Sequence, residues 1–215
     1  MRPRPTPLLL VFARAPSEDA RAKPLGVDQD RAAAVYEAML TRTLEQARAV
    51  PGATVRLVTT ECLVRAAQRG VEAEAQVAAP LSQRLEHAVA AGFARGHASV
   101  VCLCADTPGL DTVVLTRAVR ALDEDRARAV IGPAPDGGYY LVGMNAAPHG
   151  ALARVATGTI HTARDTAVSL IADFELHTLA PLADVDRSAD LRRLLRHAPL
   201  ALRRFLVHLV ALLDE

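Results

Sequence analysis

Two short, continuous apolar runs constrain the fold of this chain most strongly. They cover Pro7–Phe12 and Ser99–Ala105, and both end at turn-forming residues. Runs of this length are typical of strands that are buried on both faces of a parallel sheet. The sequence therefore predicts a sheet with its carboxyl ends at Ala13 and Ala105, where open α/β sheets bind their ligands.

Amphipathic segments alternate along the chain with these two predicted strands and with other, weaker strand patterns. Val35, Met39 and Leu44 recur at helical spacing and predict a helix over residues 31–50. Further helices are expected over residues 63–68, 81–95, 111–123, 162–171 and 199–213, and another from about residue 188. A short, weaker helix is expected over residues 148–155. Further strands are expected over residues 54–59, 72–79 and 174–179. This order predicts an α/β fold, a mostly parallel sheet with helices on both faces, in a single domain over residues 1–215.

Composition excludes several functional classes. The formal net charge of the 215 residues is +1, which does not indicate a nucleic-acid partner or an anionic membrane surface. The three cysteines are too few for a disulfide framework or a zinc site. The short apolar run after the basic N-terminus is too short for a signal peptide, so we expect a cytoplasmic protein with no membrane segment. The sequence does not indicate the oligomeric state.

The loop predicted over residues 17–30 has mixed charge. Arg14, Arg21 and Lys23 are suited to phosphate groups, whereas Glu18 and Asp19 would repel them. Its place after the first strand suits a ligand, and a solvated surface loop is an equally good interpretation.

Three carboxylates follow apolar segments at expected strand ends: Asp106, Asp136 and Asp186. Oxygen ligands of this kind hold hard divalent cations such as Mg²⁺ or Mn²⁺, which neutralise a diphosphate leaving group. Each has a simpler interpretation. Asp136 precedes Gly137 and Gly138 and fits an ordinary turn, and Asp186 fits a turn before a helix that Ser188 would cap.

Other chemistries find little support in the residues. We find no serine or cysteine in a nucleophile–base arrangement and no histidine pair with metal spacing. Cys102 and Cys104 are expected to lie on the same face of one strand and to be buried as small hydrophobic residues. The alternatives are metal binding and redox chemistry. Of the seven histidines, His161 lies in a loop suited to ligand contact.

Five blocks, taken in order, resemble a known family. They are Phe12–Pro16, Leu81–Leu85, Ala105–Leu110, Gly132–Gly143, and Asp184–Asp186 with Asp190 and Leu191. Together they look like the DUF2064 group of glycosyltransferase-A-type proteins, often labelled a glycosyltransferase family of arsenosugar biosynthesis and similar to sugar and cofactor nucleotidyltransferases. The resemblance implies a Rossmann-like glycosyltransferase-A fold that binds a nucleotide or nucleotide sugar, Mg²⁺ or Mn²⁺, and a small-molecule acceptor.

The resemblance also implies roles for individual residues. Asp106 and Asp186 would be the metal ligands, and Asp106 and Asp136 would be catalytic. The implied substrate-binding residues are Ala13, Arg14, Arg21, Lys23, Arg84, Thr107, Gly137, Gly138, Tyr139 and His161.

The first loop departs from the family pattern. A Pro-Gly pair and a Lys-Thr-Arg run are typical there, but this chain has Glu18, Asp19 and only Arg21-Ala22-Lys23. Three functions remain open. The chain is a glycosyltransferase, a nucleotidyltransferase that needs more basic charge for a triphosphate, or a non-catalytic binding or scaffold protein.

Overall fold

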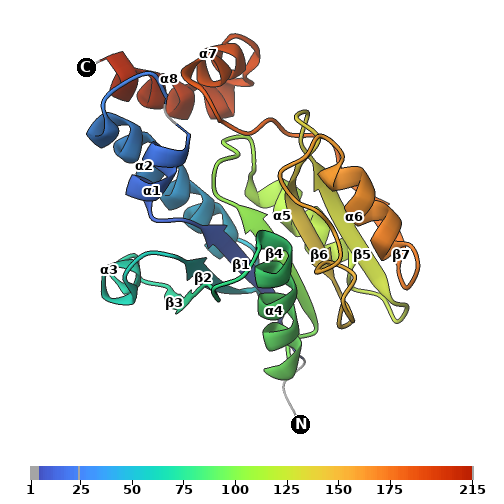
Figure 1. Cartoon of the computed structure of the whole chain (residues 1–215). Coiled ribbons are helices and arrows are strands. Elements are labelled where there is room, and N and C mark those ends of the chain that lie inside the picture. Colours follow the sequence, from blue (N-terminus) through green and yellow to red (C-terminus); the bar gives the residue numbers. More distant parts are fainter. Residues whose placement is uncertain (1–4, 24, 215) are drawn as a thin grey trace.

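A computed structural model describes residues 5–23 and 25–214, and its centre is a seven-stranded sheet (Figure 1). The strand order is β3-β2-β1-β4-β6-β5-β7, and β6 alone of these strands runs antiparallel to its neighbours. The strands are β1 (Pro7–Ala13), β2 (Thr54–Thr59), β3 (Glu72–Ala75), β4 (Ser99–Cys104), β5 (Arg128–Pro133), β6 (Tyr139–Met144) and β7 (Glu175–Thr178). The predicted fold class is confirmed.

Helices cover both faces of the sheet, as the continuous apolar runs require. Leu9 and Val11 of β1 pack in one apolar cluster with α2 (Gln29–Arg48), α3 (Leu63–Ala67) and α5 (Thr112–Ala121). Leu8 and Leu10, which point to the opposite face, pack with α4 (Leu81–Ala94) and α6 (Thr162–Leu170). All four residues are fully buried, which explains why β1 does not alternate between apolar and polar residues.

A third apolar cluster lies beyond the end of the sheet, and we call it the C-terminal cluster. It joins the first half of α2 to α7 (Ser188–His197) and α8 (Leu200–Asp214), which lie together at one end of the molecule (Figure 1). Its members include Tyr36 and Met39 of α2 and Val185, the residue between two carboxylates. The cluster therefore ties the segment before α7 to the segment after β1.

The first loop differs from its prediction, because residues 16–22 form a helix, α1 (Pro16–Ala22). Pro16 at its first position has a fixed φ that suits a helix start, and it needs no backbone N–H there. Glu18 and Asp19 lie in the first turn, where negative charge stabilises the positive end of the helix dipole. We missed the helix because it is short and shows no clear apolar period.

The expected short helix over residues 148–155 is also wrong, since this segment forms a series of turns. The carboxylate of Glu86 accepts hydrogen bonds from the backbone N–H groups of Gly150, Leu152 and Ala153. One side chain from α4 thus provides hydrogen-bond acceptors for three backbone N–H groups of this segment, although the segment is not helical. Among the described residues, no helix combines the length and apolarity needed to cross a bilayer.

We expect the C-terminal cluster to contribute strongly to stability. Leu209 of α8 is fully buried in it, whereas Val207, two residues earlier, is 52% exposed. Leu209→Ala should lower the free energy of unfolding by about 2–5 kcal/mol, because truncation leaves a cavity. Val207→Ala, the control, should change it by about 0.5 kcal/mol or less. Urea denaturation of both variants measures this, and equal losses would mean that α8 does not pack as described.

Candidate functional site

A cavity of about 480 Å³ opens at the carboxyl ends of β1 and β4. Its walls come from β1, α1, β4, the loop between β5 and β6, residues 157–160 with Thr162, and the pair Asp184 and Asp186. This is the edge where parallel α/β sheets bind ligands, because loops from neighbouring strands converge there.

Three carboxylates meet in this cavity: Asp106, Asp184 and Asp186. One oxygen atom from each lies within 4.8 Å of the other two. Asp106 follows β4, and its carbonyl oxygen accepts a hydrogen bond of 2.9 Å from the N–H of Val185. Since Val185 is buried in the C-terminal cluster, the two residues beside it are held with their carboxylates close to Asp106.

Asp184 and Asp186 lie just before α7, which is capped differently from the prediction. Arg187, not Ser188, occupies the N-cap position. The side chain of Asp190 accepts hydrogen bonds from the N–H groups of Asp186 (3.2 Å) and Arg187 (2.9 Å). The backbone of Asp186 is thus fixed by the start of the helix.

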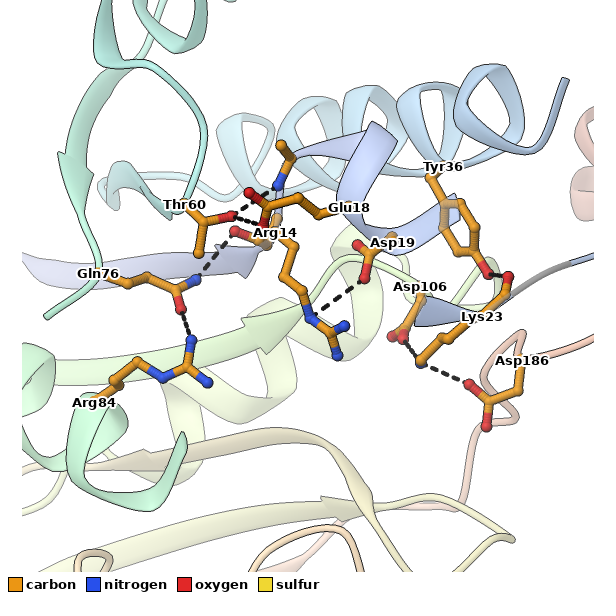
Figure 2. A network of polar contacts seen from close by, with 12 residues as sticks. Arg14, Glu18, Asp19, Lys23, Tyr36, Thr60, Gln76, Arg84, Asp106 and Asp186 are labelled. Atoms are coloured by element: carbon orange, nitrogen blue, oxygen red, sulfur yellow. Dashed lines mark hydrogen bonds and ion pairs between the residues drawn. The ribbon is translucent and has the colours of Figure 1, made fainter. Parts of the chain in front are cut away.

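Lys23 lies among these carboxylates (Figure 2). Its Nζ is 2.6 Å from Asp106 Oδ2 and 2.6 Å from Asp186 Oδ1. Burial by itself lowers the pKa of Lys23, but the charges of Asp106 and Asp186, and hydrogen bonds to them, outweigh burial and raise this pKa above its usual value. The hydroxyl of Tyr36 donates to the carbonyl of Lys23 (2.9 Å), which fixes the backbone after α1 to α2.

The residues present fit a hard divalent cation. Three carboxylates supply only oxygen, the ligand that Mg²⁺ and Mn²⁺ prefer. Thr107, next to Asp106, is 2% exposed and lines the cavity, and its hydroxyl has no hydrogen-bond partner among the described residues. Buried hydroxyls are normally paired, so Thr107 is suited to a ligand or to a water bound to the cation.

The helix α1 turns one of its two acids into the cavity. Asp19 lines the cavity, and its Oδ1 lies 3.5 Å from Nε of Arg14. Burial raises the pKa of Asp19 to about 6, although the charge of Arg14 opposes this. Glu18 points away from the cavity and accepts a hydrogen bond from Thr60, which also accepts the N–H of Ala15 (Figure 2).

Arg84 reaches the cavity from α4. Its guanidinium donates to Oε1 of Gln76, and Nε2 of Gln76 donates to the carbonyls of Ala13 and Val58, each at 3.0 Å (Figure 2). Both polar atoms of the Gln76 amide are therefore used within the protein. Nε of Arg84 is buried and has no hydrogen-bond partner among the residues that the structure describes.

The loop from Asp136 to Gly138 is both a turn and a cavity wall. Oδ1 of Asp136 accepts a hydrogen bond from the N–H of Gly138 (2.8 Å), as the turn interpretation predicts. Gly137 has a φ of +95°, and its carbonyl accepts the N–H of Ala163 (2.8 Å). A Cβ there would lie 2.1 Å from the carbonyl oxygen of Ile160, so this position requires glycine.

The cavity concentrates negative charge around Asp184. Burial, together with the charges of Asp136, Asp106 and Asp186, raises the pKa of Asp184 to about 6. Cys102 is buried, as expected, whereas Cys104 is half-buried. Burial raises the pKa of Cys102 to about 12. The Cys102 thiol is therefore neutral at neutral pH and unsuited to nucleophilic or metal-binding work.

Most of the residues implied by the family resemblance line this cavity. These are Ala13, Arg14, Lys23, Arg84, Asp106, Thr107, Asp136, Gly138, Tyr139 and Asp186. Arg21 and His161 are exposed and lie outside its lining, and Gly137 shapes the loop behind it. The roles assigned to all of these residues stay predictions.

Sequence reasoning gave no site role to many residues of the lining, among them the polar residues Asp19, Tyr36, Gln76 and Asp184. A signal existed for two of them. Asp184 is two residues from Asp186, so both share one face of an extended segment, and Asp19 is four residues from Lys23, one helical turn away.

Part of the chain matches a known protein family. Residues 41–159, more than half of the chain, match a family described as uncharacterized protein conserved in bacteria (DUF2064). No curated protein matches the chain in sequence.

Several solved structures share the fold. A protein from Desulfovibrio desulfuricans G20, described as a candidate nucleotide-diphospho-sugar transferase, superposes with a TM-score of 0.81 at 21% identity, covering 97% of this chain and 96% of its own. CMP:2-keto-3-deoxy-manno-octonic acid synthetase complexed with CTP gives 0.56 at 13% identity, covering 88% and 96%. A Mycobacterium tuberculosis H37Rv protein in complex with manganese gives 0.52 at 20% identity, covering 90% and 98%.

The clash at Gly137 predicts a large effect of one added methyl group. Gly137→Ala should lower the free energy of unfolding by about 2–4 kcal/mol, because it adds a backbone clash to the strain of a positive φ. Gly158→Ala is the control, since Gly158 also has a positive φ (+78°) but no atom within 4 Å of an added Cβ. Its cost should be about 1–2 kcal/mol. Chemical denaturation compares the two, and equal costs would contradict the close approach of Ile160.

The raised pKa of Asp184 predicts a pH dependence. Between its ordinary value of 3.8 and about 6, the folded protein binds more protons at this group than the unfolded chain does. The free energy of unfolding should therefore fall as pH rises through this window. Asp184→Asn should be more stable than the wild type at pH 7.5, and the difference should shrink toward pH 4. Denaturation at a series of pH values measures it; a constant difference would argue against burial of this charge.

Proposed function

This chain belongs to the DUF2064 family, and from that premise we propose that it is a metal-dependent transferase of glycosyltransferase-A type. Its donor is a nucleotide sugar and its acceptor a small molecule with a hydroxyl group. We propose that residues 1–215 act as one nucleotide-diphospho-sugar transferase-like domain. Mg²⁺ or Mn²⁺ serves as the cofactor.

The charge balance of the cavity carries this proposal. Five carboxylates line it, Asp19, Asp106, Asp136, Asp184 and Asp186, against three cations, Arg14, Lys23 and Arg84. Arg14 and Lys23 are paired with carboxylates already. A diphosphate brought into this cavity meets a surplus of negative charge unless a divalent cation comes with it. The cluster of Asp106, Asp184 and Asp186 supplies the oxygen ligands for that cation.

The other residues then take complementary parts. Asp106, Asp184 and Asp186 would hold the cation, which would supply stabilisation of the negative charge on the leaving diphosphate. Lys23 and Arg84 donate hydrogen bonds to phosphate or sugar oxygens, and the free hydroxyl of Thr107 adds another. Asp136, in the loop between β5 and β6, receives the proton of the acceptor hydroxyl as the hydroxyl oxygen attacks the sugar.

The likeness to solved structures supports a nucleotide ligand by analogy of fold. One similar protein is described as a nucleotide-diphospho-sugar transferase, one was solved with CTP and one with manganese. The same likeness favours a second candidate function, nucleotidyl transfer from a nucleoside triphosphate. A triphosphate carries more negative charge than a diphosphate, and the acidic lining makes the cavity less suited to it.

Metal-dependent nucleotide binding tests the proposal directly. By calorimetry, we expect a nucleoside diphosphate or nucleotide sugar to bind with Mn²⁺ and at least tenfold more weakly without it. Asp106→Asn should abolish the effect of Mn²⁺ while leaving the thermal midpoint nearly unchanged. Asp173→Asn, which removes an exposed carboxylate outside the cavity lining, should behave as the wild type.

The ligand preference separates the candidate functions. Tighter binding of a nucleoside diphosphate or nucleotide sugar supports glycosyl transfer, and tighter binding of a triphosphate supports nucleotidyl transfer. Absence of any nucleotide binding, with or without Mn²⁺, supports the non-catalytic alternative. An unchanged isotherm in Asp106→Asn would contradict the metal role of this residue.

A further inference from the structure

Lys23 contacts two of the three carboxylates that suit a divalent cation. Its ammonium lies 2.6 Å from Asp106 and 2.6 Å from Asp186 (Figure 2). The third carboxylate, Asp184, has an oxygen within 4.8 Å of an oxygen of each of the others. An ammonium placed so close to the cluster neutralises the charge that a cation would otherwise neutralise.

The ammonium and a divalent cation therefore compete for the same groups. A cation bound by the three carboxylates would be brought close to the charge of Lys23, and like charges at such distances repel strongly where water is partly excluded. The side chain of Lys23 is 24% exposed, as is that of Asp106, so solvent screens this repulsion only in part. One of the two positive groups has to leave for the other to bind well.

The local structure lets Lys23 leave without disturbing the fold. Its backbone carbonyl is held by the hydroxyl of Tyr36, and the residue follows directly after α1. The four-carbon stem of a lysine is flexible, so the ammonium can turn from the carboxylates to another acceptor in the same cavity. Thr107 is buried beside Asp106, and its hydroxyl has no partner in the part of the chain that the structure describes, which independently marks this end of the cavity as suited to a ligand.

We propose that Lys23 is an internal counter-cation that occupies Asp106 and Asp186 in the free protein and moves to the phosphates of the donor when it binds. This inference rests on the proposed function, because it needs both a divalent cation and a phosphate-bearing ligand. It adds a coupling between the two: the phosphates draw away the ammonium and free the carboxylates for the cation. Coupling of this kind is reciprocal and typically amounts to 5–150-fold in affinity.

A simpler scheme makes a different prediction. If the cation only bridges the carboxylates and the diphosphate, removal of Lys23 leaves the affinity for the cation alone unchanged. If Lys23 competes with the cation, its removal makes the cation alone bind more tightly. Removal should at the same time weaken nucleotide binding, since a phosphate partner is lost.

The decisive measurement is the dissociation constant of Mn²⁺ in the absence of nucleotide. Lys23→Met should bind Mn²⁺ at least tenfold more tightly than the wild type, measured by calorimetry or by the spectrum of free Mn²⁺. Arg31→Met is the matched control, because it removes one positive charge from a side chain 43% exposed at the start of α2, outside the cavity lining. It should stay within twofold of the wild type. Equal or weaker Mn²⁺ binding by Lys23→Met would overturn the inference.

Two further variants guard against a folding defect. Lys23→Gln removes the charge and keeps a hydrogen-bond donor, so it should also tighten Mn²⁺ binding. Lys23→Arg keeps the charge and should resemble the wild type. The thermal midpoint of each variant verifies folding, and its rise on adding Mn²⁺ gives a second readout of binding.

The coupling itself is measured with ADP, CDP, GDP and UDP as probes. In the wild type, the nucleoside diphosphate that binds should tighten Mn²⁺ binding more than it does in Lys23→Met. If Mn²⁺ binds wild type and Lys23→Met equally, while nucleotide binding still needs Mn²⁺ and Asp106, the inference fails and the proposed function stands. If neither protein binds Mn²⁺ with or without these nucleotides, both fail.

Discussion

Apolar burial away from the cavity holds the candidate site together. The helix α2 has 20 residues and is about 30 Å long, whereas β1 has seven residues and is about 23 Å long. The second half of α2 packs on the sheet, and the first half of α2 extends past the sheet edge into the C-terminal cluster. That cluster buries Val185, and the N–H of Val185 bonds to Asp106. The spacing between Asp106 and the carboxylates of Asp184 and Asp186 is thus set by leucines of α8 and by the side of α2 that packs against these leucines.

The main strands and helices can be predicted from the sequence because local patterns of neighbouring residues encode them. The uninterrupted run of β1 and the period of α2 each follow from a few neighbouring residues, and their positions were predicted within a few residues. The carboxylate after β4 was also predictable, since a charged residue directly after a buried strand lies at a sheet edge. Asp106 accordingly lines the cavity.

The remaining features depend on contacts that no local pattern encodes. The pairing of Lys23 with Asp106 joins residues 83 positions apart. Whether Asp19 points into the cavity and Glu18 away from it depends on a difference of one residue position along α1, about 100° around the helix, and on Thr60 of a neighbouring segment. Gln76 could not be found because its task is to join two strand carbonyls to Arg84. Tertiary contacts decide these positions, and propensity has little influence on them.

The order of segments in the sheet has a consequence for synthesis of the chain. The strand β6 enters between β4 and β5, and β7, the loop with Asp184 and Asp186, and α7 and α8 all follow it. A nascent chain emerging from the ribosome presents Lys23 and Asp106 long before their partners at residues 184–186. Because sheets with distant neighbours form slowly, the acidic cluster is among the last parts of the molecule to assemble. The three carboxylates can meet only after residues 184–186 have been synthesised.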